Sequence, residues 1–216
     1  MDLLNDVDVR VLGSLIEKEI TTPDHYPLSL NALTNACNQV SNRDPVMQLD
    51  EPAVKAGVDR LRKYALVRSI QRADSRVMKY MHLLRDAMSL DGPALAAMCV
   101  MMLRGPQTIG EIRTRGSRLF EFESLEAVES TLNDLAARTP PLVTRLPRQP
   151  GQKEARFAHL LSGEVTYEPA AVASAPDDTA ERAPDRISAV ESLVDELRRE
   201  ISDLRRELAE FRRQFE

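Results

Sequence analysis

The sequence predicts a mainly α-helical α+β chain in which two similar units follow one another. Two segments carry this prediction, LVRSIQRADSRVMKYMHLL from Leu66 and LVTRLPRQPGQKEARFAHLL from Leu142. Each consists of two short strand-like stretches on either side of a polar turn, which is typical of a β-hairpin. Both end in an aromatic residue, one further residue and then His-Leu-Leu. A chain of 216 residues has room for two such units and an appendage.

Three helices are expected before each hairpin. In the third helix of the first unit, Val54, Val58 and Leu61 recur at the spacing that places apolar residues on one helix face. Asp50 is expected to cap this helix, and Ser124 to cap its counterpart. Thr108 is expected to begin the second helix of the second unit in a capping box with Glu111. The expected helices cover residues 6–20, 29–41 and 51–64 in the first unit, and 93–104, 108–114 and the segment after Ser124 in the second.

The order helix, helix, helix, hairpin is that of a winged helix-turn-helix domain. In this plan the third helix enters a DNA major groove and the hairpin, or wing, contacts phosphate or the minor groove. We therefore predict two tandem winged helix-turn-helix domains, over residues 1–86 and 87–163. A flexible linker rich in Ala, Pro and Asp is expected over residues 164–186, followed by a coiled-coil helix over residues 187–216.

In residues 187–216 the apolar residues are spaced alternately three and four positions apart, as in a coiled coil. Glu200 and Glu207 at g positions would face Arg205 and Arg212 at e positions of a parallel partner, so we expect a parallel homodimer. The alternative is a single amphipathic helix that folds back on the rest of the chain. The residues expected to form the dimer are Ile187, Val190, Val194, Leu197, Ile201, Leu204, Leu208 and Phe211.

Charge is unevenly distributed along the chain. The formal net charge is −5, which argues against a simple polyanion-binding protein. Between Arg60 and Arg85, however, eight basic residues accompany one acidic residue, Asp74. Basic side chains that contact phosphates supply much of the affinity for double-stranded DNA, although a solvated surface has the same composition. The candidate DNA-binding residues are Lys55, Arg60, Arg62, Lys63, Arg68, Arg72, Arg76 and Lys79.

The third helix of the second unit lacks this charge. At the positions equivalent to Lys55 and Arg60 it has Glu129 and Asp134. The first unit is therefore the expected DNA reader. The second unit retains a basic hairpin and a basic loop, which are expected to follow a neighbouring stretch of the DNA backbone. The hairpin residues are Arg145, Arg148, Lys153 and Arg156, and the loop residues are Arg113, Arg115 and Arg118.

Four asparagines form a second candidate face for nucleic acid or a protein partner. On a helix from Ser29, the residues Asn31, Asn35, Asn38 and Asn42 would form one stripe. Amide side chains donate and accept hydrogen bonds, which suits adenine edges, phosphates or another protein's backbone. The alternative is that some of them close local turns, above all Asn42.

Signatures of catalysis are missing from the sequence. It has no Gly-rich phosphate loop and no pair of histidines at metal-binding spacing, so we expect neither an enzyme nor a bound metal or cofactor. His82 and His159 occupy the same place in the repeat, which favours packing or hydrogen bonding over catalysis. Cys37 and Cys99 are expected to be reduced core residues. No apolar run is long enough to span a membrane, and no secretory signal is apparent, so we expect a cytoplasmic protein.

The stretch LGSLIEKEITTPDHYPLSLNALTNACNQVSNRDPVM and the later LRGPQTIGEIRTRGSRLFEF resemble the YceH family of uncharacterised bacterial proteins. The resemblance spans about Leu3 to Leu161 and implies tandem winged-helix domains. It implies no activity and no catalytic residues, because the role of the family is not established. The segment after residue 163 lies outside the resemblance, so the expected dimer rests on the heptads alone.

Taken together, these features predict a homodimeric DNA-binding protein that acts as a transcriptional or nucleoid-associated regulator. The alternative is a non-catalytic scaffold that uses winged-helix domains as adaptors for protein partners.

Overall fold

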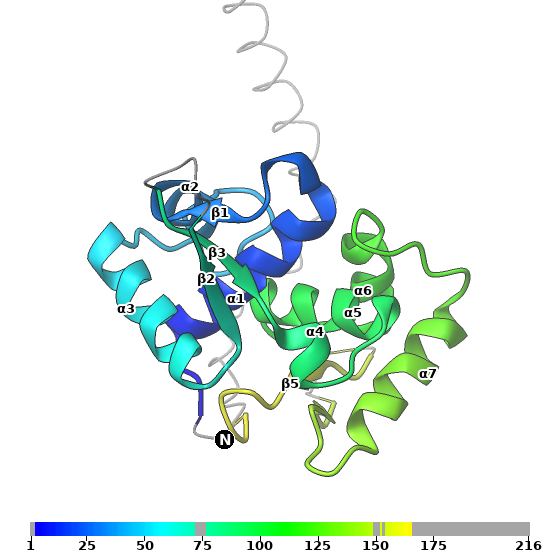
Figure 1. The fold of residues 1–216 in the computed structure, drawn as a ribbon. Helices are drawn as coiled ribbons and strands as arrows, with labels where there is room; N and C mark the ends of the chain where they lie inside the picture. Colours follow the sequence, from blue (N-terminus) through cyan, green and yellow to red (C-terminus); the bar gives the residue numbers. More distant parts are fainter. Residues whose placement is uncertain (1–2, 72–76, 149–151, 153, 166–216) are drawn as a thin grey trace, which may run out of the picture. The chain divides into compact units, whose positions relative to one another are not determined.

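Helices and strands follow one another in nearly the same order in two successive halves of the computed structural model (Figure 1). The structure describes residues 3–71, 77–148, 152 and 154–165. The chain divides into one compact unit over Met1–Tyr167 and a second over Glu168–Glu216. The second unit, with the predicted coiled coil and its dimer residues, lies outside the described residues, as does most of the predicted linker.

The first half begins with a long helix and ends with a hairpin, as predicted. Helix α3 begins after Asp50, whose side chain accepts a hydrogen bond from the Ala53 amide at 2.8 Å, so the predicted cap is confirmed. In chain order the elements are α1 (Asp6–Thr21), the 3-10 turn η1 (Pro23–His25), β1 (Leu28–Ser29), α2 (Leu30–Cys37), α3 (Glu51–Lys63), β2 (Val67–Ile70) and β3 (Lys79–His82).

The second half repeats this order after the short helix α4 (Leu84–Ala87). Thr108 and Ser124 cap its second and third helices through their side-chain oxygens, as predicted. Its elements are α5 (Gly92–Arg104), α6 (Ile109–Gly116), α7 (Leu125–Ala136), β4 (Val143–Arg145) and β5 (Phe157–His159). The α+β class and both hairpins are therefore confirmed.

The two small antiparallel sheets are built alike. The first has the order β1-β3-β2, and the second pairs β4 with β5. Gln107 forms an isolated bridge with Phe157 of β5, so it extends the second sheet where β1 extends the first. In each hairpin a histidine lies opposite a valine, His82 opposite Val67 and His159 opposite Val143. The repeat seen in the sequence is thus a repeat of strand register.

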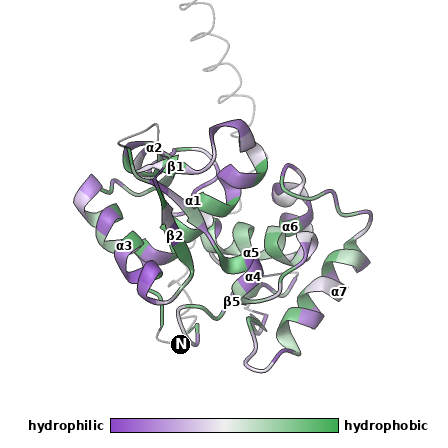
Figure 2. Ribbon diagram, in the orientation of Figure 1, coloured by the Kyte–Doolittle hydropathy of each residue, from purple (hydrophilic) through white to green (hydrophobic). Residues whose placement is uncertain are grey.

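Helices α1 and α5 pack against each other and join the halves in one core (Figure 1). Both are buried around most of their circumference, and Figure 2 shows α5 as largely hydrophobic, whereas α3 carries hydrophilic residues on its outer side. Gly13 permits the close approach, because a Cβ there would lie 2.9 Å from Leu103 Cδ2 and 3.3 Å from Met102 Cβ. The Cys99 thiol donates a hydrogen bond to the Gly13 carbonyl at 3.4 Å.

A buried ion pair adds to this junction. Glu17 of α1 and Arg43 of the loop between α2 and α3 form two hydrogen bonds of 2.6 and 3.0 Å, and neither side chain is exposed. Arg118, which follows α6 in the second half, pairs with the same carboxylate. Burial is the largest influence on the pKa of Glu17 and raises it, but the two arginines outweigh burial and hold that pKa below its usual value.

One helix is shorter than predicted. Helix α2 ends at Cys37, whereas the sequence indicated a helix to about Ser41. Asn38 ends it by exchanging two 2.7 Å hydrogen bonds with the backbone of Leu49, and Asn42 has a φ of 59°, which is outside the helical region. The prediction of one four-asparagine stripe is therefore wrong.

Candidate nucleic-acid interface

The predicted DNA-reading helix α3 carries basic side chains that are mostly paired within the protein. Lys55 and Arg62 both form ion pairs with Asp59, and all three side chains are exposed or half-exposed. Such surface pairs contribute little to stability and exchange readily with other partners. Both cations therefore remain able to reach a phosphate, but the carboxylate of Asp59 lies between them.

Arg60 has a different environment. Its guanidinium lies 2.8 Å from the carboxylate of Asp8, whose side chain is 2 % exposed. Asp8 also accepts a hydrogen bond from the Asn5 amide in the capping box that begins α1. Because an unpaired carboxylate is costly to bury, Arg60 serves to neutralise Asp8 and to hold α3 against α1. It is less suited to bind phosphate than the sequence indicated.

The hairpin presents its cations outward. In the register of β2 and β3, Arg68 lies opposite Met81 and Ile70 opposite Lys79, so Arg68 and Lys79 share one face of the sheet. The other face carries Val67 and Tyr80, which are buried in the core. Lys63, at the last residue of α3, is also exposed. Arg72 and Arg76 lie outside the described residues.

The asparagines do not form one free surface. Asn31 donates to Glu51 at 3.4 Å and accepts from Asn35 at 3.3 Å, which links α2 to the start of α3. Asn38 closes the end of α2 on Leu49, and Asn42 accepts from Arg104 of α5. The contacts of Asn38 and Asn42 favour the alternative that these residues close turns.

The two repeated histidines occupy equivalent hairpin positions, and His82 forms hydrogen bonds with its neighbours. His82 is buried, its Nε2 lies 2.9 Å from Glu19 and its backbone amide donates to the Tyr26 hydroxyl at 2.8 Å. The hydrogen bond to His82 lowers the pKa of Glu19, and burial raises the pKa of Tyr26. In the second half, burial lowers the pKa of His159 to about 4, so that imidazole is neutral at pH 7.

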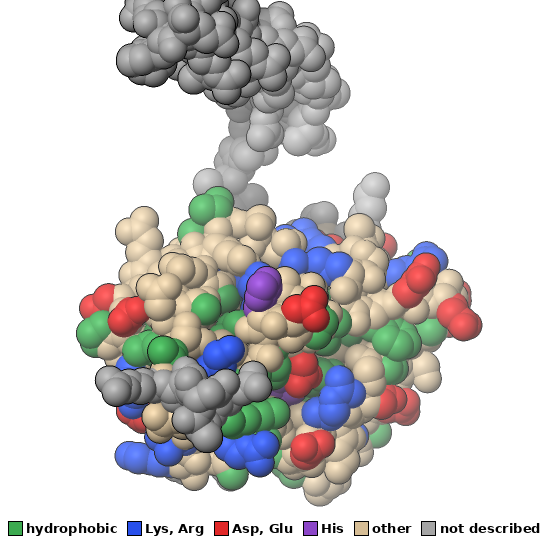
Figure 3. Space-filling model, turned by 45° about the horizontal axis from the view of Figure 1, so that its top comes forward, with side chains coloured by type: hydrophobic (Ala, Val, Ile, Leu, Met, Phe, Trp, Pro, Cys, Tyr) green, Lys and Arg blue, Asp and Glu red, His purple; other side chains and the backbone are tan. Residues whose placement is uncertain are grey.

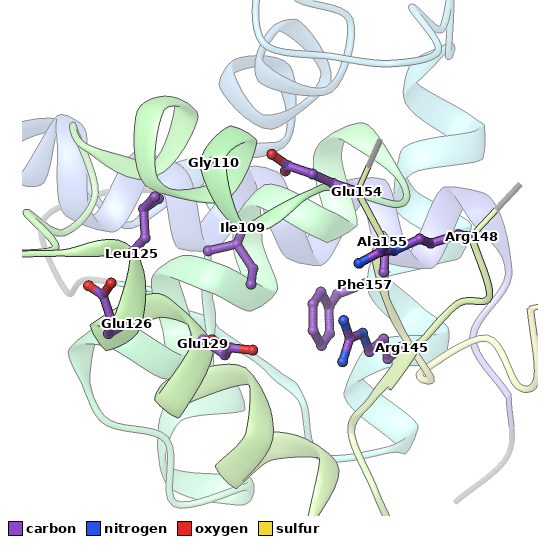
Figure 4. A pocket seen from close by; sticks show the side chains of 10 residues that line it. All are labelled: Ile109, Gly110, Leu125, Glu126, Glu129, Arg145, Arg148, Glu154, Ala155 and Phe157. Carbon is purple, nitrogen blue, oxygen red and sulfur yellow. The ribbon is translucent and has the colours of Figure 1, made fainter. Parts of the chain in front are cut away.

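The second half has a groove where α7 approaches its hairpin (Figure 4). It has a volume of about 310 Å³, and its apolar floor includes Ile109 and Phe157. Glu126 and Glu129 of α7 line one side, and Arg145 lies over the Phe157 ring at 5.9 Å from the centroid. The groove thus combines acidic side chains on α7 with basic side chains on the hairpin.

Most cations around α6 have internal partners. Arg156 pairs with Glu111 at 2.8 Å, Arg115 contacts Gln107 and Glu111, and Arg113 donates to backbone carbonyls. With Arg118 engaged by Glu17, the predicted basic loop is occupied in holding the fold. On the face shown in Figure 3, basic and acidic side chains are interspersed. Lys153 lies outside the described residues.

Both cysteine thiols are buried. Burial raises the pKa of the Cys37 thiol to about 11 and that of Cys99 further, so both are protonated at neutral pH. Within the described ranges, no cluster of three or more His, Cys, Asp or Glu side chains is placed to hold a metal ion. No helix in those ranges combines the length and apolarity needed to cross a membrane.

Comparison with known proteins places these features in a family. Residues 4–152 match the family model described as "Protein of unknown function, DUF480". The chain belongs to this family. The match covers the first half and the second half as far as the residues after β4, and it confirms the resemblance to a family of uncharacterised bacterial proteins that the sequence indicated.

Relatives in the family include three proteins named only UPF0502 protein. That of Geotalea daltonii is 58% identical over 161 residues, which cover 74% of this chain and 73% of the relative. That of Pelobacter propionicus is 50% identical over 218 aligned residues and covers 99% of both chains. That of Aliivibrio fischeri is 46% identical over 206 residues, which cover 93% and 94% of the two chains. The similarity thus extends, in some relatives, into the segment after residue 163.

Proposed function

We propose that this protein binds double-stranded DNA through its first half, as a winged helix-turn-helix domain without catalytic activity. One observation carries the proposal. Arg68 and Lys79 share the outward face of the β2-β3 hairpin, and Arg68 follows the exposed Lys63, the last residue of α3, by five residues. A helix end and a wing that present cations together are suited to follow a phosphate backbone.

The proposal also revises the contact residues. Lys63, Arg68 and Lys79 form the primary phosphate surface, with Lys55 and Arg62 available after they release Asp59. Arg60 is assigned to the internal pair with Asp8. DNA binding of this kind is non-specific in its main energetic component and depends steeply on salt. The proposal includes a cytoplasmic location for the protein.

The test compares two double variants in the full-length protein by fluorescence anisotropy on a mixed-sequence duplex across a range of salt. Arg68→Ala with Lys79→Ala removes two cations from the first hairpin, and Arg145→Ala with Arg148→Ala removes two exposed cations from the second. We expect the first variant to flatten the slope of log K against log salt by about 2, which corresponds to two lost phosphate contacts. The second variant should change the slope by less than the first does, because the second hairpin is expected to contact only a neighbouring stretch of backbone.

Two results would overturn the assignment. Equal losses in the two double variants would show that the first hairpin has no special role. If the wild-type protein shows no binding even at low salt, DNA binding itself is wrong.

A homodimer through residues 187–216 remains part of the proposal and rests on the heptad pattern. Deletion of these residues should convert a dimer to a monomer in sedimentation equilibrium. A truncated chain that stays dimeric would place the principal interface elsewhere.

A second function, that of a non-catalytic protein adaptor, is supported by the groove beside α7. Its wall carries Glu126 and Glu129, and Leu125 beside them is 45% exposed, which suits a protein segment better than DNA. Glu126→Lys with Glu129→Lys should leave duplex affinity unchanged if this groove faces a protein. A marked gain in duplex affinity would show that the groove faces DNA.

A further inference from the structure

The outer side of helix α3 carries an acid among its cations. The inner side of the helix packs on α1, and the outer side presents exposed or half-exposed residues that include Lys55, Ala56, Asp59 and Arg62. In the proposed binding mode this outer side faces the DNA. Phosphates repel a carboxylate, so Asp59 opposes the binding that its neighbours favour. Its place on this side therefore needs a reason other than phosphate contact.

Helix stability is a weak reason. Asp59 accepts a hydrogen bond from Lys55 at 2.5 Å, and the two residues stand four positions apart with the cation first. A pair at this spacing stabilises a helix better when the acid comes first, because the acid is then nearer the positive N-terminal end of the helix dipole. The order found in α3 (Glu51–Lys63) is the less stabilising one.

The pair places a donor and an acceptor side by side at the surface. The side chain of Lys55 is 42% exposed and that of Asp59 is 43% exposed. An ammonium has three N–H groups and a carboxylate has about four acceptor sites, so each group can take a further partner while the pair stays intact. Arg62 lies 3.5 Å from the other oxygen of Asp59. The carboxylate is thus held from both sides.

This donor and acceptor match one base pair in the major groove. Guanine presents two neighbouring acceptors there, O6 and N7, and its partner cytosine presents an amino donor at N4. Lysine donates to the guanine acceptors, and aspartate accepts from the cytosine amino group. In an A·T pair, the O4 acceptor of thymine takes the place of that amino group and repels a carboxylate.

The neighbouring side chain leaves room for such a contact. Aspartate is short, so its carboxylate reaches a base edge only where the helix backbone comes close to the floor of the groove. Ala56, which follows Lys55 and precedes Asp59 by three residues, is exposed and ends at its Cβ. A helix fits into the major groove, and a small residue on its contact side permits a close approach.

We infer that Lys55 and Asp59 read a G·C base pair in the major groove. The inference rests on the proposed DNA binding, and it gives Lys55 a base contact in place of a phosphate contact. The ammonium donates to guanine O6 and N7, and the carboxylate accepts from cytosine N4. A good contact of this kind changes the affinity for the two base pairs by about 5-fold to 150-fold.

The test uses the full-length protein and three duplexes of equal length in fluorescence anisotropy at one salt concentration. Their base pairs are all G·C, all A·T or all inosine·cytosine, in the same order of purines and pyrimidines. Inosine keeps O6 and N7 but lacks the minor-groove amino group of guanine, so it separates major-groove reading from minor-groove reading and shape. We expect the G·C and inosine·cytosine duplexes to bind at least about fivefold more tightly than the A·T duplex.

Two substitutions of the half-exposed Asp59 test its part in this preference. Asp59→Ala removes the acceptor and should abolish the preference for G·C over A·T. Asp59→Asn supplies an amide that suits the adenine edge and should shift the preference toward A·T. Asp134→Ala is the matched control, because it removes an exposed acid from α7 and changes the net charge equally; it should leave the preference unchanged.

Each contrary result has a distinct meaning. Equal binding of the three duplexes by the wild type refutes base reading and leaves phosphate binding in place. If inosine·cytosine binds as A·T does, the protein reads the minor groove or the shape of the duplex, and the inference is wrong. An Asp59→Ala variant that tightens all duplexes by one factor shows that Asp59 only repels phosphate. No binding to any duplex refutes the proposed function and this inference with it.

Discussion

Removing the carboxylate of Glu17 by Glu17→Met leaves Arg43 as a buried cation without its counter-ion. Glu17 and Arg43 are both fully buried and share two hydrogen bonds, whereas Arg118 is 38% exposed and regains solvent when it loses Glu17. The cost therefore arises at Arg43. Its remaining contacts are hydrogen bonds to the oxygens of Ala36, Gln39 and Asn42.

The magnitude follows from this burial. Removal of one partner of a buried ion pair costs about 3–5 kcal/mol, because the other charge stays desolvated. Replacement of both partners by apolar side chains of similar volume is close to neutral. We therefore expect Glu17→Met to lose about 3–5 kcal/mol of unfolding free energy, and Glu17→Met with Arg43→Met to recover most of that loss.

Urea unfolding at pH 7, followed by circular dichroism, measures both variants against the wild type. The coupling energy from the double-mutant cycle should exceed about 2 kcal/mol. Arg118→Ala is the control for an exposed partner and should cost about 0–1 kcal/mol. Additive losses, or a Glu17→Met variant within about 1 kcal/mol of the wild type, would refute the assignment of this pair as a structural charge centre.

Three further predictions concern pH and packing. Burial lowers the pKa of His159 to about 4 in the folded protein, below the 6.5 of the unfolded chain. The free energy of unfolding should therefore be at its full value above pH 6.5 and decline by up to about 3 kcal/mol as the pH falls to 4. His159→Asn should remove this decline, as measured by the midpoints of urea unfolding. The lowered pKa of Glu17 adds a further loss only below about pH 4.5, which Glu17→Gln should abolish in acid titrations of unfolding. Gly13→Ala should lower Tm through a clash at the α1-α5 contact worth about 1–3 kcal/mol. In contrast, a Cβ at Gly110 would meet only Thr108 Oγ1, at 4.0 Å, so Gly110→Ala should leave Tm unchanged or raise it slightly in calorimetry.

Local signals in the sequence predicted the elements well where short-range chemistry determines them. Asp50, Thr108 and Ser124 were recognisable as caps because their side-chain oxygens act within three residues. The hairpins were recognisable because their strands repeat in pattern and end in the same His-Leu-Leu. Helix α2 was predicted too long because the partner of Asn38 is Leu49, which no periodicity reveals.

The candidate site was harder to predict because the charge composition does not show which charged side chains form ion pairs with each other in the fold. Arg60 was indistinguishable from Lys63 in the sequence, yet its partner Asp8 lies 52 residues away in a different helix. Arg10 and His159 line one groove although they are far apart in the chain, because the packing of α1 against α5 brings the two halves together.

The shared core of α1 and α5 has a consequence for how this chain can be divided. Tandem domains usually each bury their own apolar residues, so that a single domain can be excised and studied. Here a fragment that stops at residue 86 would lack α5, which packs against α1 at Gly13, and would present an apolar helix face to water. Such fragments are expected to aggregate. The duplicated motif therefore acts as one indivisible building block.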